Sequence, residues 1–180
     1  MDVADLNFSN TEMRLEMIAA MEFWITEAGV DGFRCDAADL VPFDFWQDAL
    51  STLETNTQRD LIFLAEGTRN DHFAAGFQMN FSWDYYNTVK NVFVSNGNPS
   101  QLSTTNTNEY QVVPAGKKKL RFTTNHDLSN ELTPIGVFGN KNAALAASVA
   151  TIFMNGTPLI YSGQEVGVSN PRSEERRVGK

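Results

Sequence analysis

Leu61-Ile62-Phe63-Leu64-Ala65-Glu66-Gly67 is the stretch of sequence that decides the fold. Its first five residues are all apolar, and the run has the length of a strand that is buried on both faces, which is typical of a parallel sheet. A glutamate and a glycine end the run. We therefore expect a central strand at residues 61–65 with a carboxylate at its C-terminal end.

Helical and strand-like patterns alternate on both sides of this run. Upstream, Ser9 and Glu12 have the spacing of a capping box, and apolar residues then recur at helical intervals until Gly29. The segment 96–119, rich in Asn, Ser, Thr, Gly and Pro, is expected to be mostly loop around at most a short helix. The other expected elements are helices at 11–28, 45–53, 85–94 and 143–154 and strands at 33–37, 79–83, 120–124 and 158–161.

Strands that alternate with helices imply parallel βαβ units, so the expected fold class is α/β. Five such strands favour a partial (β/α)8 TIM barrel covering roughly the second half of the barrel, and a doubly wound sheet is the alternative. A complete barrel takes about 250 residues, whereas this chain has 180. We expect residues 1–168 to form the partial barrel and residues 169–180 to be a charged tail, disordered or foreign. Unpaired strand edges should make the chain aggregate or remain partly unfolded when it is produced alone.

The composition excludes several classes of function. The net charge is -8 and no basic stripe is present, so nucleic acid is not an expected partner. No apolar run approaches the roughly 18 residues of a membrane span, and the single cysteine, Cys35, excludes an internal disulfide. The first residues carry no signal-peptide pattern. Secreted, periplasmic and cytoplasmic locations of the full-length protein all stay open, as does its oligomeric state.

Three acidic residues share one placement along the chain. Asp36, Glu66 and Asp127 each fall at the C-terminal end of an expected buried strand, where barrel enzymes carry their catalytic groups. One such carboxylate alone is more often a helix cap or a turn residue. Three of them can meet at the mouth of a barrel, where mutual repulsion and burial separate their protonation states.

Short motifs surround these carboxylates: GFRCDAA at 32–38, LAEG at 64–67 and FTTNHD at 122–127. In this order they resemble the nucleophile, acid/base and third-carboxylate motifs of the α-amylase family of glycoside hydrolases. ADLN at 4–7 and GTPLIYSGQE at 156–165 resemble two further segments of that family. The resemblance covers residues 2–168 and implies a catalytic barrel domain that cleaves α-glucans or maltooligosaccharides.

The resemblance also implies the roles of individual residues. Asp36 would attack the anomeric carbon, Glu66 would act as acid and then base, and Asp127 would hold the hydroxyl groups of the distorted sugar. In this retaining scheme the two reacting carboxyl groups lie roughly 5–5.5 Å apart. Arg34, on the same strand face as Asp36, and His126 would bind substrate, while Asn125 would orient its neighbours.

The sequence departs from the family pattern after the nucleophile motif. Many amylases have Lys-His where this chain has Asp39 and Leu40, and the family's first motif is absent. The chemistry requires no cofactor; a structural calcium in the full-length enzyme stays open, with no ligand assignable in this chain. The open alternatives to a hydrolase are a transglycosylase of the same family and a noncatalytic amylase-like interaction module.

Several other residues invite a functional interpretation. Phe81, Trp83, Tyr85 and Tyr86 suit both sugar stacking and core packing, with packing favoured. His72 has no visible partner and is expected at the surface, while Cys35 is expected to be a small packed hydrophobe.

Overall fold

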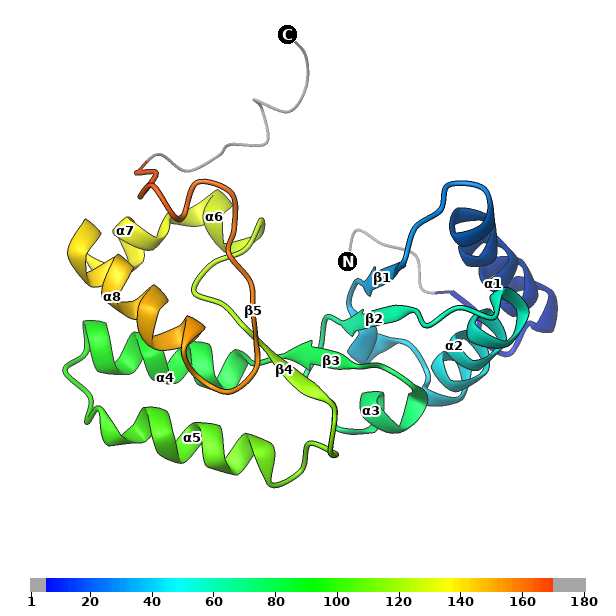
Figure 1. The fold of residues 1–180 in the computed structure, drawn as a ribbon, viewed down its shortest axis with the longest axis horizontal. Coiled ribbons are helices and arrows are strands. Elements are labelled where there is room, and N and C mark those ends of the chain that lie inside the picture. Colours follow the sequence, from blue (N-terminus) through cyan, green and yellow to red (C-terminus); the bar gives the residue numbers. More distant parts are fainter. Residues whose placement is uncertain (1–5, 170–180) are drawn as a thin grey trace, which may run out of the picture. The chain divides into compact units, whose positions relative to one another are not determined.

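A computed structural model describes residues 6–169 of the chain, which divide into two compact units (Figure 1). The first unit comprises residues 6–81 together with Pro114–Lys117, and the second comprises Ser82–Val113 and residues 118–169. Residues 170–180 of the expected tail and residues 4 and 5 of the ADLN motif lie outside the described residues. The division into a domain at 1–168 and a tail stays a prediction.

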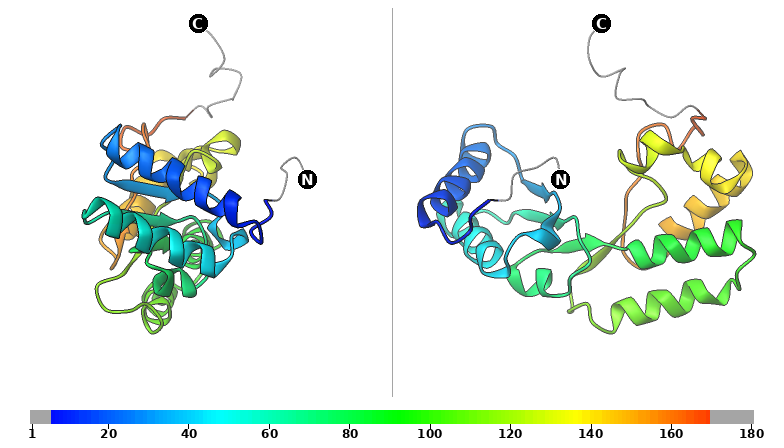
Figure 2. Two further views of the ribbon diagram at one scale, coloured as in Figure 1. Left: turned by 90° about the vertical axis from the view of Figure 1, so that its right-hand side faces the viewer. Right: turned by 180° about the vertical axis from the view of Figure 1, so that it is seen from behind.

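The first unit is built from βα repeats around a parallel sheet. Its elements are α1 (Thr11–Thr26), β1 (Gly32–Cys35), a 3-10 turn (Ala38–Leu40), α2 (Phe43–Thr57), β2 (Ile62–Ala65), α3 (Asp71–Ala75) and β3 (Met79–Phe81). Strand β2 pairs in parallel with β1 on one side and with β3 on the other. Figure 2 shows α1 and α2 side by side, and α2 also packs on α3.

Burial explains why these segments adopt their conformations. Phe63 and Ala65 of β2 are fully buried, but Ile62 is 57% exposed and Leu64 is only partly buried, so the predicted burial on both faces is wrong for the described residues. Phe63 and Ala65 join a core with the apolar face of α2, whose buried residues recur at helical spacing: Phe45, Trp46, Ala49, Leu50 and Leu53. The strand is thus stabilised by the helix that precedes it in the chain, as in a βαβ unit.

The second unit contains mostly helices and two parallel strands. Its elements are α4 (Trp83–Val94), α5 (Ser100–Tyr110), β4 (Lys118–Arg121), α6 (Leu128–Glu131), α7 (Pro134–Phe138), α8 (Lys141–Ile152) and β5 (Thr157–Pro158). Strands β4 and β5 pair in parallel, and α4 and α5 form a helical hairpin (Figure 1). Within residues 6–169, no helix combines the length and apolar character needed to cross a bilayer.

The expected helices and strands are present with shifted ends, but two sequence predictions are wrong. The segment 96–119 is not mainly loop, because α5 occupies Ser100–Tyr110. Its Ser, Thr and Asn residues are individually weak helix formers, and contact with α4 compensates for them. The capping box is also wrong: Asn10, not Ser9, caps α1, and its side chain accepts a hydrogen bond from the Met13 amide.

A buried ion pair organises the second unit, and no sequence motif indicates it. Arg121 of β4 is 1% exposed and donates to the carboxylate of Glu109, at 2.5 Å, and to the hydroxyl of Ser82. Its remaining donors bind the side chain of Asn106 and the carbonyl of Asn155. Because each of its three nitrogens meets a partner, the guanidinium can stay charged inside the unit.

Replacement of Gly32 tests the register between β1 and β2. Gly32 has φ +152°, and an added Cβ would lie 1.9 Å from the carbonyl oxygen of Ile62, its partner in the ladder. Gly32→Ala should therefore lower the free energy of unfolding by about 2–4 kcal/mol. Gly29→Ala is the matched control, since Gly29 has φ +71° but open space around the Cβ position, and it should cost only about 1 kcal/mol. Equal losses in urea unfolding of the two full-length variants would contradict this account.

Candidate active site

The pairing of β1 with β2 brings two of the predicted carboxylates together. Cys35 lies opposite Ala65 in the parallel ladder, so the next residues along each strand, Asp36 and Glu66, leave neighbouring strand ends. The amide N–H of Glu66 continues the ladder by donating to the carbonyl of Cys35, at 2.9 Å. The C-terminal edge of the sheet therefore carries both side chains, as expected for barrel enzymes.

Arg34 connects the two carboxylates. One guanidinium nitrogen pairs with the Asp36 carboxylate, and the other lies 2.5 Å from Oε1 of Glu66. The guanidinium also lies over the ring of Phe81, 6.0 Å from its centroid. A planar fork with fixed nitrogen positions thus holds two oxygens from two strands, which limits the separation of the carboxyl groups.

The two carboxylates have different environments. The side chain of Asp36 is 77% exposed, whereas that of Glu66 is only 17% exposed. Burial raises the pKa of Glu66 above its usual range, and the neighbouring Asp36 adds to this rise. The Ala37 amide, which donates to Oε2 of Glu66 at 3.0 Å, and the Arg34 charge oppose it. Glu66 therefore holds a proton more readily than an ordinary glutamate.

The third predicted carboxylate, Asp127, belongs to the second unit, together with His126. Nε2 of His126 lies 3.4 Å from Oδ1 of Asp127, and both side chains are substantially exposed. Asn125 is buried, and its Oδ1 accepts from the amides of Asp127 and Leu128 at 3.0 and 2.8 Å. Asn125 thus holds the main chain at Asp127 and Leu128, and its role as an orienting residue in the site stays a prediction.

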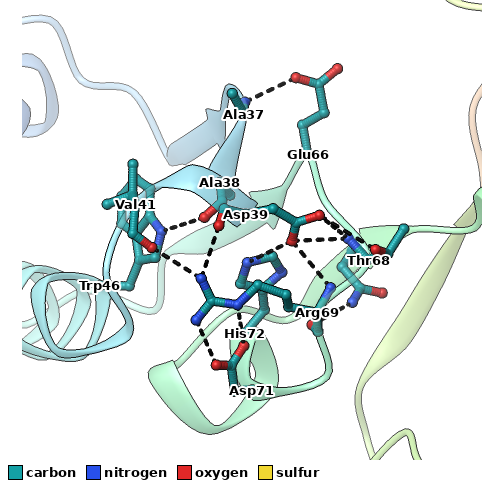
Figure 3. A network of polar contacts seen from close by, with 11 residues as sticks. Ala37, Ala38, Asp39, Val41, Trp46, Glu66, Thr68, Arg69, Asp71 and His72 are labelled. Atoms are coloured by element: carbon teal, nitrogen blue, oxygen red, sulfur yellow. Dashed lines mark hydrogen bonds and ion pairs between the residues drawn. The ribbon is translucent and has the colours of Figure 1, made fainter. Parts of the chain in front are cut away.

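Sequence reasoning missed a polar network behind Glu66 (Figure 3). The Asp39 carboxylate accepts from the amides of Thr68 and Arg69 in the loop that follows β2. His72 was expected at the surface, which is wrong: it is 1% exposed, and its Nε2 lies 3.4 Å from Oδ1 of Asp39. Asp39 and its partners are some 30 positions apart in the chain. The only hint in the sequence is Gly67, which makes room for both side chains.

The aromatic residues near β3 belong mainly to the core. Phe81, Tyr85 and Tyr86 are at most 4% exposed, so core packing is the correct interpretation for them. Trp83 is partly exposed and packs edge-on against Phe122, with ring centroids 4.9 Å apart. Cys35 lies in the core of the first unit, where burial raises the pKa of its thiol to about 12. A thiol with that pKa stays protonated at neutral pH and is not a nucleophile.

A metal centre built from side chains would need several ligands in one place. Within residues 6–169, no three His, Cys, Asp or Glu side chains are grouped in that way. A structural calcium in the full-length protein, for which the sequence assigns no ligand in this chain, stays open.

Parallel strands that alternate with helices, with paired carboxylates at the strand ends, define an α/β fold with a candidate active site at the C-terminal edge of its sheet. The chain belongs to the alpha-amylase family, whose catalytic-domain model matches residues 1–179. The fold is accordingly part of a (β/α)8 barrel, and the doubly wound alternative is dropped.

The similarity of the chain to known proteins supports this family assignment. Alpha-amylase 3 of Dictyoglomus thermophilum is 28% identical over 97% of this chain and 36% of its own length. The 4-alpha-glucanotransferase of Thermotoga maritima is 28% identical over 91% of this chain and 37% of its own length. The crystal structure of an alpha-amylase from Lactobacillus plantarum superposes with a TM-score of 0.83 at 25% identity, covering 96% of this chain and 44% of that one. The chain thus spans less than half of each of these relatives.

The raised pKa of Glu66 implies that its carboxyl group affects the thermal stability of the protein in a pH-dependent way. A group whose pKa is higher in the folded than in the unfolded protein loses its stabilising contribution as the pH rises through the folded value. Glu66→Gln should therefore raise the melting temperature of the full-length protein at pH 7. The gain should fade as the pH falls through the folded pKa of Glu66 and should be lost below about 4.3, where the carboxyl becomes neutral in the unfolded chain as well. Glu16→Gln, at an exposed position of α1, is the control and should change little. A gain for Glu66→Gln that persists unchanged at low pH would refute this assignment.

Proposed function

We propose that the full-length protein is a retaining α-glycosidase that hydrolyses α-glucosidic bonds of starch-like glucans or maltooligosaccharides. The observation that carries the proposal is the Arg34 bridge between an exposed aspartate and a largely buried glutamate. Two oxygens on one guanidinium favour the short carboxyl separation of retaining enzymes, roughly 5–5.5 Å, over the roughly 6.5–9.5 Å of inverting ones. The relatives named alpha-amylase support the class of substrate.

The environments of the carboxylates support a division of labour. Asp36, kept ionised by Arg34, attacks the anomeric carbon and forms the covalent glycosyl-enzyme. Glu66 starts protonated, as its raised pKa favours, and gives this proton to the departing glycosidic oxygen. It then takes a proton from the water that attacks the intermediate. Asp127 and His126 hold sugar hydroxyl groups, and Arg34 completes the substrate-binding set.

Substitution of the two strand-end carboxylates tests these roles. In the full-length protein, Glu66→Gln should lower kcat on maltooligosaccharides by about 10²–10⁴-fold because the leaving group loses its acid. Asp36→Asn should lower it at least as far because no covalent intermediate can form. Asp60→Asn is the matched control. Asp60 is exposed and lies just before the N-terminal end of β2, away from the carboxylates, so this variant should retain activity. Full activity of Asp36→Asn would refute the mechanism and favour a site elsewhere.

The stereochemistry of the first product is an independent test. A double displacement releases the α-anomer, which proton NMR distinguishes from the β-anomer before mutarotation. Initial release of the β-anomer would show inversion and would contradict the role of Asp36 as nucleophile.

A second candidate function is transfer of the glycosyl group to another sugar. The similarity to a 4-alpha-glucanotransferase favours it, because transfer and hydrolysis share the same intermediate. Incubation with maltooligosaccharides distinguishes the two: released reducing ends indicate hydrolysis, and products longer than the substrate indicate transfer. Predominant chain lengthening would replace the hydrolase assignment. A noncatalytic interaction module would instead show neither product.

A further inference from the structure

Residues 37–39, which follow Asp36, form hydrogen bonds to the end of β2 and to the loop after it in three places. The amide of Ala37 donates to the Glu66 side chain at 3.0 Å, and the amide of Ala38 donates to the Glu66 carbonyl at 2.9 Å. The Asp39 carboxylate then accepts from the amides of Thr68, at 3.0 and 3.2 Å, and Arg69, at 3.2 Å. Three consecutive residues thus fix the side chain of Glu66, its backbone and the loop behind it (Figure 3).

These hydrogen bonds depend on an unusual backbone conformation at Ala37. Ala37 has φ +43°, a left-handed conformation that costs a non-glycine residue about 1–2 kcal/mol. The turn that it makes directs the Ala38 amide toward the end of β2 and the Asp39 side chain toward the loop after it. Gly67 supplies the matching space: an added Cβ would lie 2.4 Å from Oδ1 of Asp39 and 2.7 Å from Cε1 of His72. Both loops are therefore shaped for close approach.

His72 forms the back of the Asp39 site. Its ring packs against Phe77, with centroids 5.4 Å apart, and neither ring nitrogen has a hydrogen-bond partner among the described residues. Burial lowers the pKa of His72 and Arg69 adds to this effect, while Asp39, the main chain of Ala38 and Asp71 oppose it. The imidazole is thus neutral at neutral pH and does not draw Asp39 away from the two amides.

Arg69 also binds the main chain around Asp39. Its guanidinium donates to the carbonyls of Asp39 and Val41, at 3.0 and 3.2 Å, and pairs with the Asp71 carboxylate. The main chain around Asp39 is therefore held on both sides, by its own carboxylate and by Arg69.

We propose that Asp39 is a positioning residue for Glu66: it locks the loop after β1 to the loop after β2 so that the Ala37 amide stays on the Glu66 carboxyl group. The inference rests on the proposed function, in which Glu66 is the acid/base. The Ala37 amide favours the ionised form of Glu66, and Arg34 and Asp36 are the charged groups of the first unit that face the same carboxyl. Loss of the lock therefore has two consequences: the carboxyl group is misplaced, and its pKa rises further.

Substitution of Asp39 in the full-length protein tests the lock. Asp39→Ala removes both acceptors and should lower kcat by about 10–100-fold, as expected for a small misplacement of a catalytic group, with KM much less affected. The basic limb of the pH profile of kcat/KM, which reports the acid, should move to higher pH. Asp39→Asn keeps one acceptor oxygen and should be intermediate in both respects. Asp44→Asn, which breaks an ion pair with Arg14 in the same unit, is the control and should leave the pH profile in place.

The possible results distinguish failure of the positioning role of Asp39 from failure of the proposed function. If wild type is active, Glu66→Gln is inactive and both Asp39 variants keep the wild-type kcat and pH profile, the lock is refuted. A loss of kcat in folded Asp39→Asn without any displacement of the basic limb also refutes it, because a purely structural role would give that result. If wild type releases no sugar from any glucan, or Glu66→Gln stays active, the proposed function fails and the inference fails with it.

Discussion

Parallel pairing of β1 with β2 is the constraint on which the rest of the candidate site depends. The register that places Cys35 opposite Ala65 also places Asp36 beside Glu66, and a shift by one residue would turn one of the two side chains toward the opposite face. Gly32 makes this register possible at the other end of the ladder, because only a residue without Cβ fits against the Ile62 carbonyl. The steric requirement for glycine at position 32, at the start of β1, thus favours the register that places Asp36 beside Glu66 at the end of the strands.

Arg34 gives this pairing its electrostatic character. Without a cation, two carboxyl groups at neighbouring strand ends repel each other, and one of them takes up a proton. The guanidinium pairs with the exposed Asp36, while burial raises the pKa of Glu66. Two residues of similar intrinsic acidity therefore lie in surroundings of different character.

Strain and polar burial are concentrated behind the same site. Ala37 is left-handed, Gly67 is in close contact with Asp39, and His72 is buried without a hydrogen bond to its ring. Each feature is unfavourable on its own and persists only where the surrounding contacts over-determine it. The buried Arg121–Glu109 pair in the second unit differs, because each nitrogen of Arg121 has a partner and the pair lies in the core.

The sequence by itself determined the alternation of strands and helices, the strand at Leu61–Ala65 and the placement of Asp36 and Glu66 at strand ends, since periodicity and chain direction are local properties. It underestimated α5, whose weakly helical residues depend on contact with α4, and it misplaced His72. The Arg34 bridge to Glu66 and the network around Asp39 join residues about 30 positions apart. Only the tertiary structure decided these contacts, because side chains from separate βα units meet when the strands pair and not before.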